Sequence, residues 1–338
     1  MNDKTFLMRR GVCVEPHRFE LWPAPLPLSA PPGWALVDIA AMGVCGTDYH
    51  IFEGKHPYLE YPRVIGHELS GRLVEDCGSM AKGTLVVVNP YLACGECRAC
   101  RNNKPNCCAR IEVLGVHRDG GLCARIAIPQ GNLYPADGLT DVQAAMVEFL
   151  AIGAHAVARA GDISSSRALI TGAGPIGLGA ALFARLAGAE VHLLDISAKR
   201  LQKVGESFGF THLHHGATHL LEGERADGFD VIFDATGNAQ SIEAGFAFLA
   251  HGGTYVLISV VKDRISFNDP EFHKREARLI GSRNALKEDF MRVIAAIRAG
   301  QIDTSALLSE ELHIDELAAR LPLLAKDRED LIKAIVYP

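Results

Sequence analysis

The sequence predicts an α/β protein that combines a doubly wound parallel sheet with a mostly β domain. The chain has 338 residues, which at roughly 150 residues per domain corresponds to about two domains. Residues 168–281 alternate short apolar runs with longer amphipathic stretches, whereas residues 1–141 are rich in Gly and Pro. Alternating strands and helices with short connections are typical of a parallel sheet with helices on both faces.

The first 141 residues are expected to form mainly β structure. Segments such as Trp34–Ala41 and Thr84–Asn89 have the short apolar pattern of strands and are separated by turn residues. Near the other end, residues 288–299 and 315–325 have the spacing of amphipathic helices, and Ile332–Tyr337 resembles a closing strand. The expected organisation is a β domain at 1–145, a parallel-sheet domain at 146–285, and a return to the β domain at 286–338.

The alternating block contains the expected elements of the parallel sheet. Its strands are expected at Ala168–Thr171, Val191–Asp195, Val231–Asp234, Thr254–Ser259 and Arg278–Gly281. Helical spacing occurs between them, for example at Ala198–Phe208 and Ser241–Ala250. This order of elements predicts a Rossmann-type domain.

Composition and charge exclude several classes of protein. The chain is 48% hydrophobic and 22% charged, as in ordinary globular proteins, and its formal net charge of −6 makes nucleic acid an unfavourable partner. The first 16 residues lack the apolar core of a signal peptide. The longest uncharged stretch, Ala168–Ala184, contains four glycines and a proline, which disfavours a membrane helix. We therefore expect a cytoplasmic protein with no membrane or nucleic-acid partner.

A glycine-rich turn follows the first expected strand of the Rossmann-type block. It contains G-x-G-x-x-G, a pattern that lets backbone N–H groups approach a pyrophosphate at the start of a helix. The cofactor-binding residues predicted for this turn are Gly172, Gly174, Pro175, Ile176 and Gly177. Asp195, 18 residues past Gly177, ends the second strand, where a carboxylate would bind the adenine ribose and favour NAD. Arg200 is a further predicted cofactor-binding residue, and because Lys199 and Arg200 follow Asp195 closely, NADP stays open. The alternative for the turn is simple packing without a nucleotide.

Four of the nine cysteines lie in one short loop with the spacing C-x2-C-x2-C-x7-C. These are Cys94, Cys97, Cys100 and Cys108. Four thiolates on a loop without an apolar pattern of its own predict a structural zinc site. An iron–sulfur cluster and an accidental cluster of surface thiols are the alternatives, and Cys107 could compete with Cys108 as the fourth ligand.

A second group of metal-ligand residues is spread along the chain. Cys45 precedes Thr47 and His50, and the pair His67–Glu68 follows after a short interval. Glu148 lies much later, in an apolar helix-like segment where an unpaired charge would be costly. A Cys, His and Glu set with one open position suits catalytic zinc. Taken singly, these residues have ordinary interpretations as a core thiol, a core histidine and a salt-bridge partner.

Together these motifs resemble the zinc-dependent medium-chain alcohol dehydrogenase family. The resemblance is carried by G-x-C-G-T-D-x-H at 43–50, G-H-E at 66–68, the four-cysteine loop and the glycine-rich turn, and it covers nearly the whole chain. It implies a GroES-like catalytic domain beside the Rossmann domain, two zinc ions per chain, NAD, a small-molecule substrate, and a homodimer or homotetramer.

The resemblance also implies roles for individual residues. Cys45, His67 and Glu68 would be ligands of the catalytic zinc, with Glu148 either a fourth ligand or linked to the ion through water. Thr47 would receive the proton of the alcohol, and His50 would pass that proton to solvent. The alternatives are a simple loop turn for Thr47 and a solvated surface residue for His50.

Within the family, V-E-F-L at 147–150 resembles the polyol and sugar-acid branch, although Phe149 replaces the usual proline. Segments 114–121, 234–238 and 269–285 are similar to bacterial hexonate 5-dehydrogenases, which oxidise L-galactonate or L-gulonate at C5. Arg283 stands where the sorbitol dehydrogenase branch has a substrate-contacting arginine, so the resemblance implies that Arg283, with His117 as a weaker candidate, binds the substrate carboxylate. The alternative for Arg283 is a salt bridge or a contact to the cofactor.

Several alternatives remain. The substrate could be a polyol or threonine. A cofactor-binding relative without catalysis and a zinc-ribbon nucleic-acid binder are the two non-enzymatic alternatives.

Overall fold

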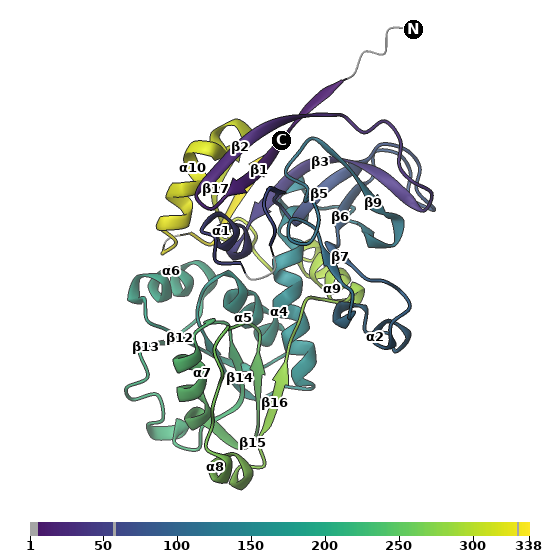
Figure 1. Cartoon of the computed structure of the whole chain (residues 1–338). Helices are drawn as coiled ribbons and strands as arrows, with labels where there is room; N and C mark the ends of the chain where they lie inside the picture. The colour runs from purple at the N-terminus through teal and green to yellow at the C-terminus, as the bar shows by residue number, and fades with distance from the viewer. Residues whose placement is uncertain (1–5, 57–58, 330) are drawn as a thin grey trace, which may run out of the picture. The chain divides into compact units, whose positions relative to one another are not determined.

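The computed structural model of the chain describes residues 6–56, 59–329 and 331–338, which divide into two units (Figure 1). The first unit comprises Met1–Glu148 and Leu286–Pro338, and the second comprises Phe149–Ala285. The first unit therefore contains both ends of the chain, and the second is one continuous insertion.

The first unit is built mainly from antiparallel strands. Their bounds are β1 Leu7–Glu15, β2 Arg18–Pro25, β3 Trp34–Val44, β4 Arg63–Val64, β5 Glu68–Leu73, β6 Leu85–Val88, β7 Tyr91–Leu92, β8 Glu112–Val113, β9 Arg125–Pro129, β10 Leu133–Pro135, β17 Leu308–His313 and β18 Lys333–Tyr337. The main sheet has the order β10-β6-β5-β3-β18-β17, with β9 also pairing with β3. The strand β18 lies antiparallel to β3, with Ala334 opposite Val44. The last strand of the chain therefore lies beside the strand that leads to Cys45.

Short helices connect the strands of the first unit. They are α1 Gly46–Phe52, α2 Arg98–Arg101, α3 Asp141–Ala145, α9 Lys287–Arg298 and α10 Ile314–Lys326, with 3-10 turns at Pro105–Cys107 and Gln130–Asn132, and α4 Val147–Ala160 begins in this unit. Buried side chains of β3, β5 and β6 form its core together with apolar residues of α10.

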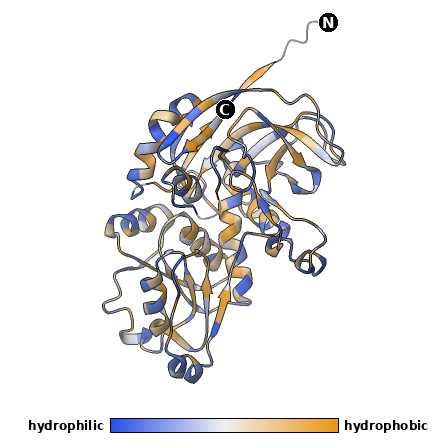
Figure 2. Ribbon diagram, viewed as in Figure 1, coloured by the Kyte–Doolittle hydropathy of each residue, from blue (hydrophilic) through white to orange (hydrophobic). Residues whose placement is uncertain are grey.

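The second unit is a parallel sheet with the order β13-β12-β11-β14-β15-β16. The strands are β11 Arg167–Thr171, β12 Glu190–Asp195, β13 His212–His215, β14 Phe229–Asp234, β15 Leu249–Leu257 and β16 Arg278–Gly281, and the helices are α5 Pro175–Leu186, α6 Ala198–Phe208, α7 Ala239–Gly245 and α8 Asp269–Lys274. The central strands are largely hydrophobic (Figure 2), as strands covered on both faces must be. The predicted doubly wound fold is confirmed.

The structure corrects two details of this domain. The helix expected at Ser241–Ala250 ends at Gly245, a 3-10 turn follows at Phe246–Phe248, and Leu249 already belongs to β15. Leu249 pairs with Phe229 of the neighbouring strand, and this long-range pairing overrides the local helical pattern. The edge strand β13 was not expected, because its sequence H-L-H-H is too polar for a buried strand.

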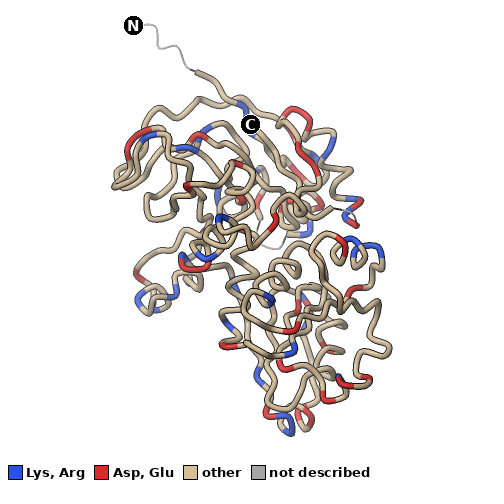
Figure 3. The backbone as a smooth tube through the Cα atoms, turned by 180° about the vertical axis from the view of Figure 1, so that it is seen from behind, with Lys and Arg blue, Asp and Glu red and all other residues tan. Residues whose placement is uncertain are grey.

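Acidic and basic residues are interspersed on both units (Figure 3), in keeping with the modest net charge of −6. Among the described residues, no helix has the length and apolar character needed to cross a membrane. The uncharged stretch at 168–184 forms most of β11, the glycine-rich turn and most of α5.

Candidate functional site

Cys45 occupies the junction between β3 and α1. Its backbone is extended, and its sulfur caps the helix by accepting a hydrogen bond from the backbone N–H of Thr47 at 3.3 Å. The backbone N–H of Cys45 donates to Asp48 Oδ2 at 3.0 Å, which completes a capping box. The G-x-C-G-T-D motif therefore holds the thiol in place through local hydrogen bonds.

Two glycines make room for the pair His67–Glu68 at the start of β5. Gly66 has a φ of 101°, which favours glycine, and a Cβ on Gly43 would lie only 2.0 Å from Glu68 Oε2. Gly43 lies opposite Glu68 in the antiparallel pairing of β3 with β5. The absence of a side chain at 43 thus leaves space for the buried carboxylate of Glu68.

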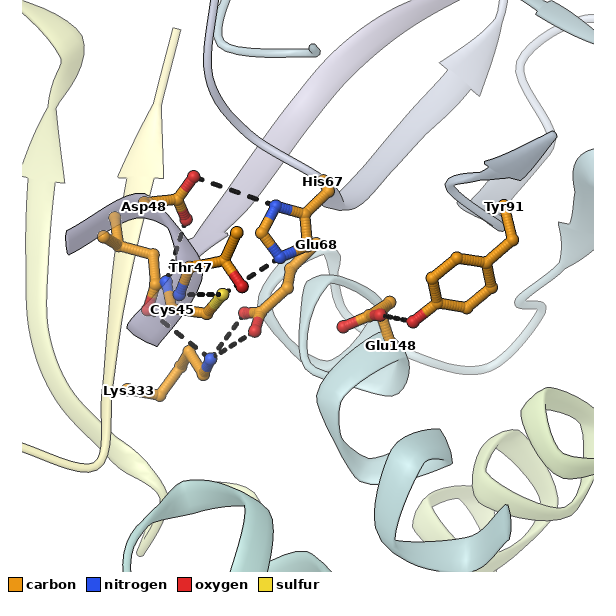
Figure 4. Close-up of polar contacts among 9 residues, drawn as sticks. Cys45, Thr47, Asp48, His67, Glu68, Tyr91, Glu148 and Lys333 are labelled. Atoms are coloured by element: carbon orange, nitrogen blue, oxygen red, sulfur yellow. Dashed lines mark hydrogen bonds and ion pairs between the residues drawn. The ribbon is translucent and has the colours of Figure 1, made fainter. Parts of the chain in front are cut away.

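His67 lies between Cys45 and Asp48 (Figure 4). Its Nε2 is 2.9 Å from Cys45 Sγ, and its Nδ1 is 3.8 Å from Asp48 Oδ1. Within the described part of the chain, Nδ1 and Oδ1 are both buried without a hydrogen-bond partner. A metal-ligating histidine commonly directs its second nitrogen at a carboxylate, and these two unpaired atoms fit that arrangement.

Glu148 approaches the same cluster from the first turn of α4. The hydroxyl of Tyr91 on β7 donates a hydrogen bond to Glu148 Oε1, and Phe290 packs edge-on against the Tyr91 ring. Burial raises the pKa of the Glu148 carboxyl to about 7, against the opposing effect of His67. Burial, followed by the charge of Glu148, raises the pKa of the Tyr91 hydroxyl.

Lys333, the first residue of β18, provides a cation. Its Nζ lies 2.6 and 2.5 Å from the two carboxylate oxygens of Glu68, and both side chains are 1% exposed. Lysine is almost never fully buried unless it is paired. The ion pair therefore ties the C-terminal strand to the cluster.

The predicted zinc ligands are brought together in space. The ligand atoms of His67, Glu68 and Glu148 lie within 4.8 Å of one another, as do those of Cys45, Asp48 and His67. Burial raises the pKa of the Cys45 thiol. For His67, burial lowers the pKa but Cys45 and Asp48 raise it, and the net shift is strongly upward. The two groups share His67, and together they offer the thiol, imidazole and carboxyl ligands that bind a divalent cation.

The other predicted site residues are more exposed. Thr47 is half-buried beside Cys45, whereas His50, one turn further along α1, is exposed. His117 is exposed in the first unit, and its Nδ1 accepts a hydrogen bond from the backbone N–H of Val113 at 3.1 Å. Arg283 is exposed just after β16 in the second unit.

The four-cysteine loop forms a separate cluster in the first unit. The sulfurs of Cys94, Cys97, Cys100 and Cys108 all lie within 4.8 Å of one another, whereas Cys107 is exposed. Backbone N–H groups of Cys94 and Arg110 both donate to Cys108 Sγ at 3.3 Å. The side chain of Arg110 lowers the pKa of Cys94 to about 6, and thiolate is the form that binds zinc. The four sulfurs can therefore coordinate one zinc ion tetrahedrally.

The glycine-rich turn joins β11 to α5. Gly172 has a φ of 90°, and a Cβ on Gly177 would lie 1.8 Å from the Gly172 oxygen. In contrast, a Cβ on Gly174 would meet no described atom within 4 Å apart from its neighbours along the chain, so the helix N-terminus is open at that point. Pro175 and Ile176 form the first turn of the helix.

Asp195 lies at the end of β12, beside the glycine-rich turn. Its Oδ2 accepts from the backbone N–H of Ala173 at 2.7 Å, and its Oδ1 accepts from Ser197 at 2.8 Å. Arg200 Nη1 is 3.7 Å from Oδ2. Two backbone N–H groups thus orient the Asp195 carboxylate, and each of its oxygens keeps a lone pair that can accept a hydrogen bond from a ribose hydroxyl.

Sequence reasoning missed three residues of the first cluster: Asp48, Tyr91 and Lys333. Asp48 had a signal, since an acidic residue at the third helical position is typical of a capping box. Lys333 interrupts an apolar closing strand, and a buried lysine implies an acidic partner. Tyr91 had no comparable signal, because its contact with Glu148 depends on tertiary structure.

Comparison with known proteins identifies the family. Residues 31–138 match the alcohol dehydrogenase GroES-like domain, and residues 175–299 match the zinc-binding dehydrogenase domain. The L-galactonate-5-dehydrogenase of Escherichia coli K12 is 38% identical over 309 residues, which cover 89% of this chain and 91% of that protein.

Two solved structures have the same fold. The L-idonate 5-dehydrogenase of E. coli K-12 MG1655 is 25% identical with a TM-score of 0.89, covering 98% of this chain and 99% of that one. A structure described as a short chain alcohol dehydrogenase (rspB) from E. coli CFT073, complexed with cofactor NADH, is 25% identical with a TM-score of 0.90 and the same coverage. The chain therefore belongs to the zinc-type alcohol dehydrogenase family, and the prediction of a zinc-binding oxidoreductase with a GroES-like and a Rossmann-type domain is confirmed.

Proposed function

We propose that this enzyme oxidises the C5 hydroxyl of a hexonate, such as L-galactonate or L-gulonate, to a 5-keto acid and transfers the hydride to NAD. The L-galactonate-5-dehydrogenase, 38% identical over most of both chains, carries the substrate assignment. The structural similarity to L-idonate 5-dehydrogenase adds a second enzyme named for oxidation of a sugar acid at C5.

Two zinc ions per chain are part of this proposal. Cys45, His67 and Glu68 would hold the catalytic ion, with Glu148 as a fourth ligand or a partner through water, and the four-cysteine loop would hold a structural ion. Bound zinc supplies Lewis acidity, which favours loss of an alcohol proton near neutral pH.

The chain's own residues would orient the site and move the proton. Asp48 Oδ1 faces His67 Nδ1 at 3.8 Å and would orient the imidazole with Nε2 toward Cys45. Thr47, half-buried beside the thiol, would accept the proton of the substrate hydroxyl, and the exposed His50 would release it to solvent. An exposed imidazole suits this role because its ordinary pKa lies near neutral pH.

The turn from Gly172 to Gly177 would bind the pyrophosphate of NAD, and Asp195 would bind the adenine ribose. The open helix N-terminus at Gly174 and the backbone-oriented carboxylate support this assignment. A carboxylate at this position repels the 2'-phosphate of NADP, although Arg200 lies beside it.

The carboxylate of the substrate requires a cation. We assign this role to Arg283, which is exposed and follows β16, because a guanidinium binds a carboxylate through two parallel hydrogen bonds. His117 is the weaker candidate.

Steady-state kinetics with paired substrates test the substrate assignment. We expect the enzyme to prefer L-galactonate or L-gulonate over the corresponding alditols, which lack the carboxylate. Arg283→Met should lower kcat/KM for the acid by roughly two orders of magnitude and for the alditol much less. Preference for the alditol, or an equal loss with both substrates, would indicate a polyol dehydrogenase.

A separate experiment distinguishes an enzyme from a cofactor-binding relative without catalysis. Cys45→Ala should abolish turnover and leave NADH binding close to that of the wild type, since the glycine-rich turn belongs to the second unit. Normal turnover in this variant would remove Cys45 from the ligand set.

A further inference from the structure

A cluster of histidines lies on one face of the second unit, at the edge of its parallel sheet. Glu190 and His192 alternate along β12, and His212 and His214 alternate along β13. The two strands are parallel, with His192 opposite His212 and Leu194 opposite His214. Because side chains alternate between the faces of a sheet, all four residues project from the same face.

The donor atoms of this cluster lie close together. Those of Glu190, His192 and His212 are within 4.8 Å of one another. The rings of His192 and His212 stack with centroids 4.3 Å apart, and His192 Nε2 is 2.7 Å from Glu190 Oε1. His192 Nδ1 lies 2.9 Å from His214 Nε2, a contact in which one nitrogen must be the acceptor and at least one ring must be neutral.

From this geometry we propose a third metal site, in which Glu190, His192 and His212 bind a divalent transition-metal ion such as Zn²⁺. Two imidazoles and one carboxylate are a ligand set that suits zinc, with water at the remaining position. In this site Nε2 of His192 binds the ion, and its Nδ1–H donates to His214 Nε2. Such a hydrogen bond on the far side of a ligating ring orients the ring and is common in zinc sites.

One ligand of the cluster is buried and two are exposed, and this difference favours binding of a metal ion. The His192 side chain is 1% exposed and packs edge-on against Phe229 at a centroid distance of 5.2 Å, so the innermost ligand is already oriented. Glu190 and His212 are exposed and can rotate onto an ion that enters from solvent. A divalent ion therefore requires little change of the backbone.

Two arginines face the cluster and oppose a cation. Arg167 Nε is 3.5 Å from Glu190 Oε1. Arg225 donates hydrogen bonds to the backbone oxygens of Leu220 and His219, and its charge acts on both His192 and His214. We therefore expect this site to bind zinc more weakly than the four-thiolate loop.

A metal ion at this position would stabilise the edge of the parallel sheet. The strand β13 is the edge of the sheet and pairs only with β12 among the described strands. An ion held by both strands ties that edge to β12, the strand that ends at Asp195. Bound metal should raise the melting temperature of the second unit by mass action, independently of the substrate and of the proposed reaction.

Zinc titration of the full-length protein tests the proposal. Protein loaded with zinc and freed of excess metal is titrated with Zn²⁺ by calorimetry, with NADH binding as the check on folding. The wild type should take up one further equivalent with a rise in melting temperature. His212→Ala should lose that equivalent, whereas His251→Ala, which removes an exposed histidine on β15, should retain it.

Two further variants distinguish a residue that binds the metal from a residue that only orients a ligating ring. Glu190→Gln should weaken binding while leaving the strands intact. His214→Ala should weaken it by roughly 10- to 100-fold without changing the stoichiometry, as expected when a hydrogen bond behind a ligating ring is lost. Absence of a further equivalent in the wild type, or equal uptake by the wild type and His212→Ala, would overturn the proposal.

Discussion

Replacing Lys333 by methionine should destabilise the first unit strongly. The substitution removes the cation 2.5 Å from Glu68 and leaves a carboxylate that is 1% exposed without its partner. Removing one member of a buried ion pair typically costs about 3–5 kcal/mol, because the remaining charge stays desolvated. Methionine nearly conserves the volume of lysine, so a cavity contributes little.

The expected change in melting temperature follows from the size of the unit. For a domain of this size, 1 kcal/mol corresponds to roughly 2–4 °C, so in zinc-free protein Lys333→Met should lower the transition of the first unit by roughly 6–20 °C. Differential scanning calorimetry resolves this transition. The matched control is Lys82→Met, which removes an exposed lysine in the same unit and should change stability by less than about 0.5 kcal/mol.

Metal removal and a double variant test whether the unpaired Glu68 carboxylate causes the loss of stability. Zinc beside Glu68 would replace the missing cation, so zinc removal should destabilise Lys333→Met more than it destabilises the wild type. Adding Glu68→Gln to Lys333→Met should recover much of the loss in metal-free protein, because the buried charge is gone. If Lys333→Met melts like Lys82→Met with and without zinc, the ion pair does not stabilise the fold and this reasoning is wrong.

Three further results are expected. Cys97→Ser should remove about one zinc per chain and lower the melting temperature, because a hydroxyl poorly replaces a thiolate; unchanged zinc content by elemental analysis would contradict the structural site. Asp195→Ala should weaken NAD binding and reduce discrimination against NADP in fluorescence titrations, and a wild type that already prefers NADP would refute this role. Burial lowers the pKa of His214 to about 4, whereas an unfolded histidine titrates near 6.5. The unfolded chain therefore binds more protons between these values, and the unfolding free energy should fall as pH falls through this window. Urea denaturation should show a weaker pH dependence in His214→Gln, and an identical dependence in both proteins would disprove the assignment.

The sequence alone determined features that are encoded within single segments. The four cysteines lie in one loop and the three glycines in one turn, so their spacing nearly dictates their geometry. The helix at Ala198–Phe208 was predicted from its helical spacing with its observed bounds, and in the structure Ser197 caps its start and Gly209 its end. The doubly wound fold was predicted from the alternation of strand and helix patterns, and this prediction does not depend on the exact bounds of any single element.

Tertiary structure alone decided the contacts between distant segments. Lys333 reaches Glu68 only because β18 lies beside β3, and Tyr91 meets Glu148 only when a two-residue strand packs against α4. Tertiary structure also decided β15, because its pairing with β14 makes a strand of residues predicted as the end of a helix. It decided β13 as well, because the histidine-rich sequence of β13 did not predict a strand and its pairing with β12 forms one. Hydrophobic periodicity reports which face of an element is buried, but it does not identify the partner. Partners are selected by the packing of the whole chain, so the charges and hydrogen bonds around the candidate zinc ligands emerged only from the folded structure.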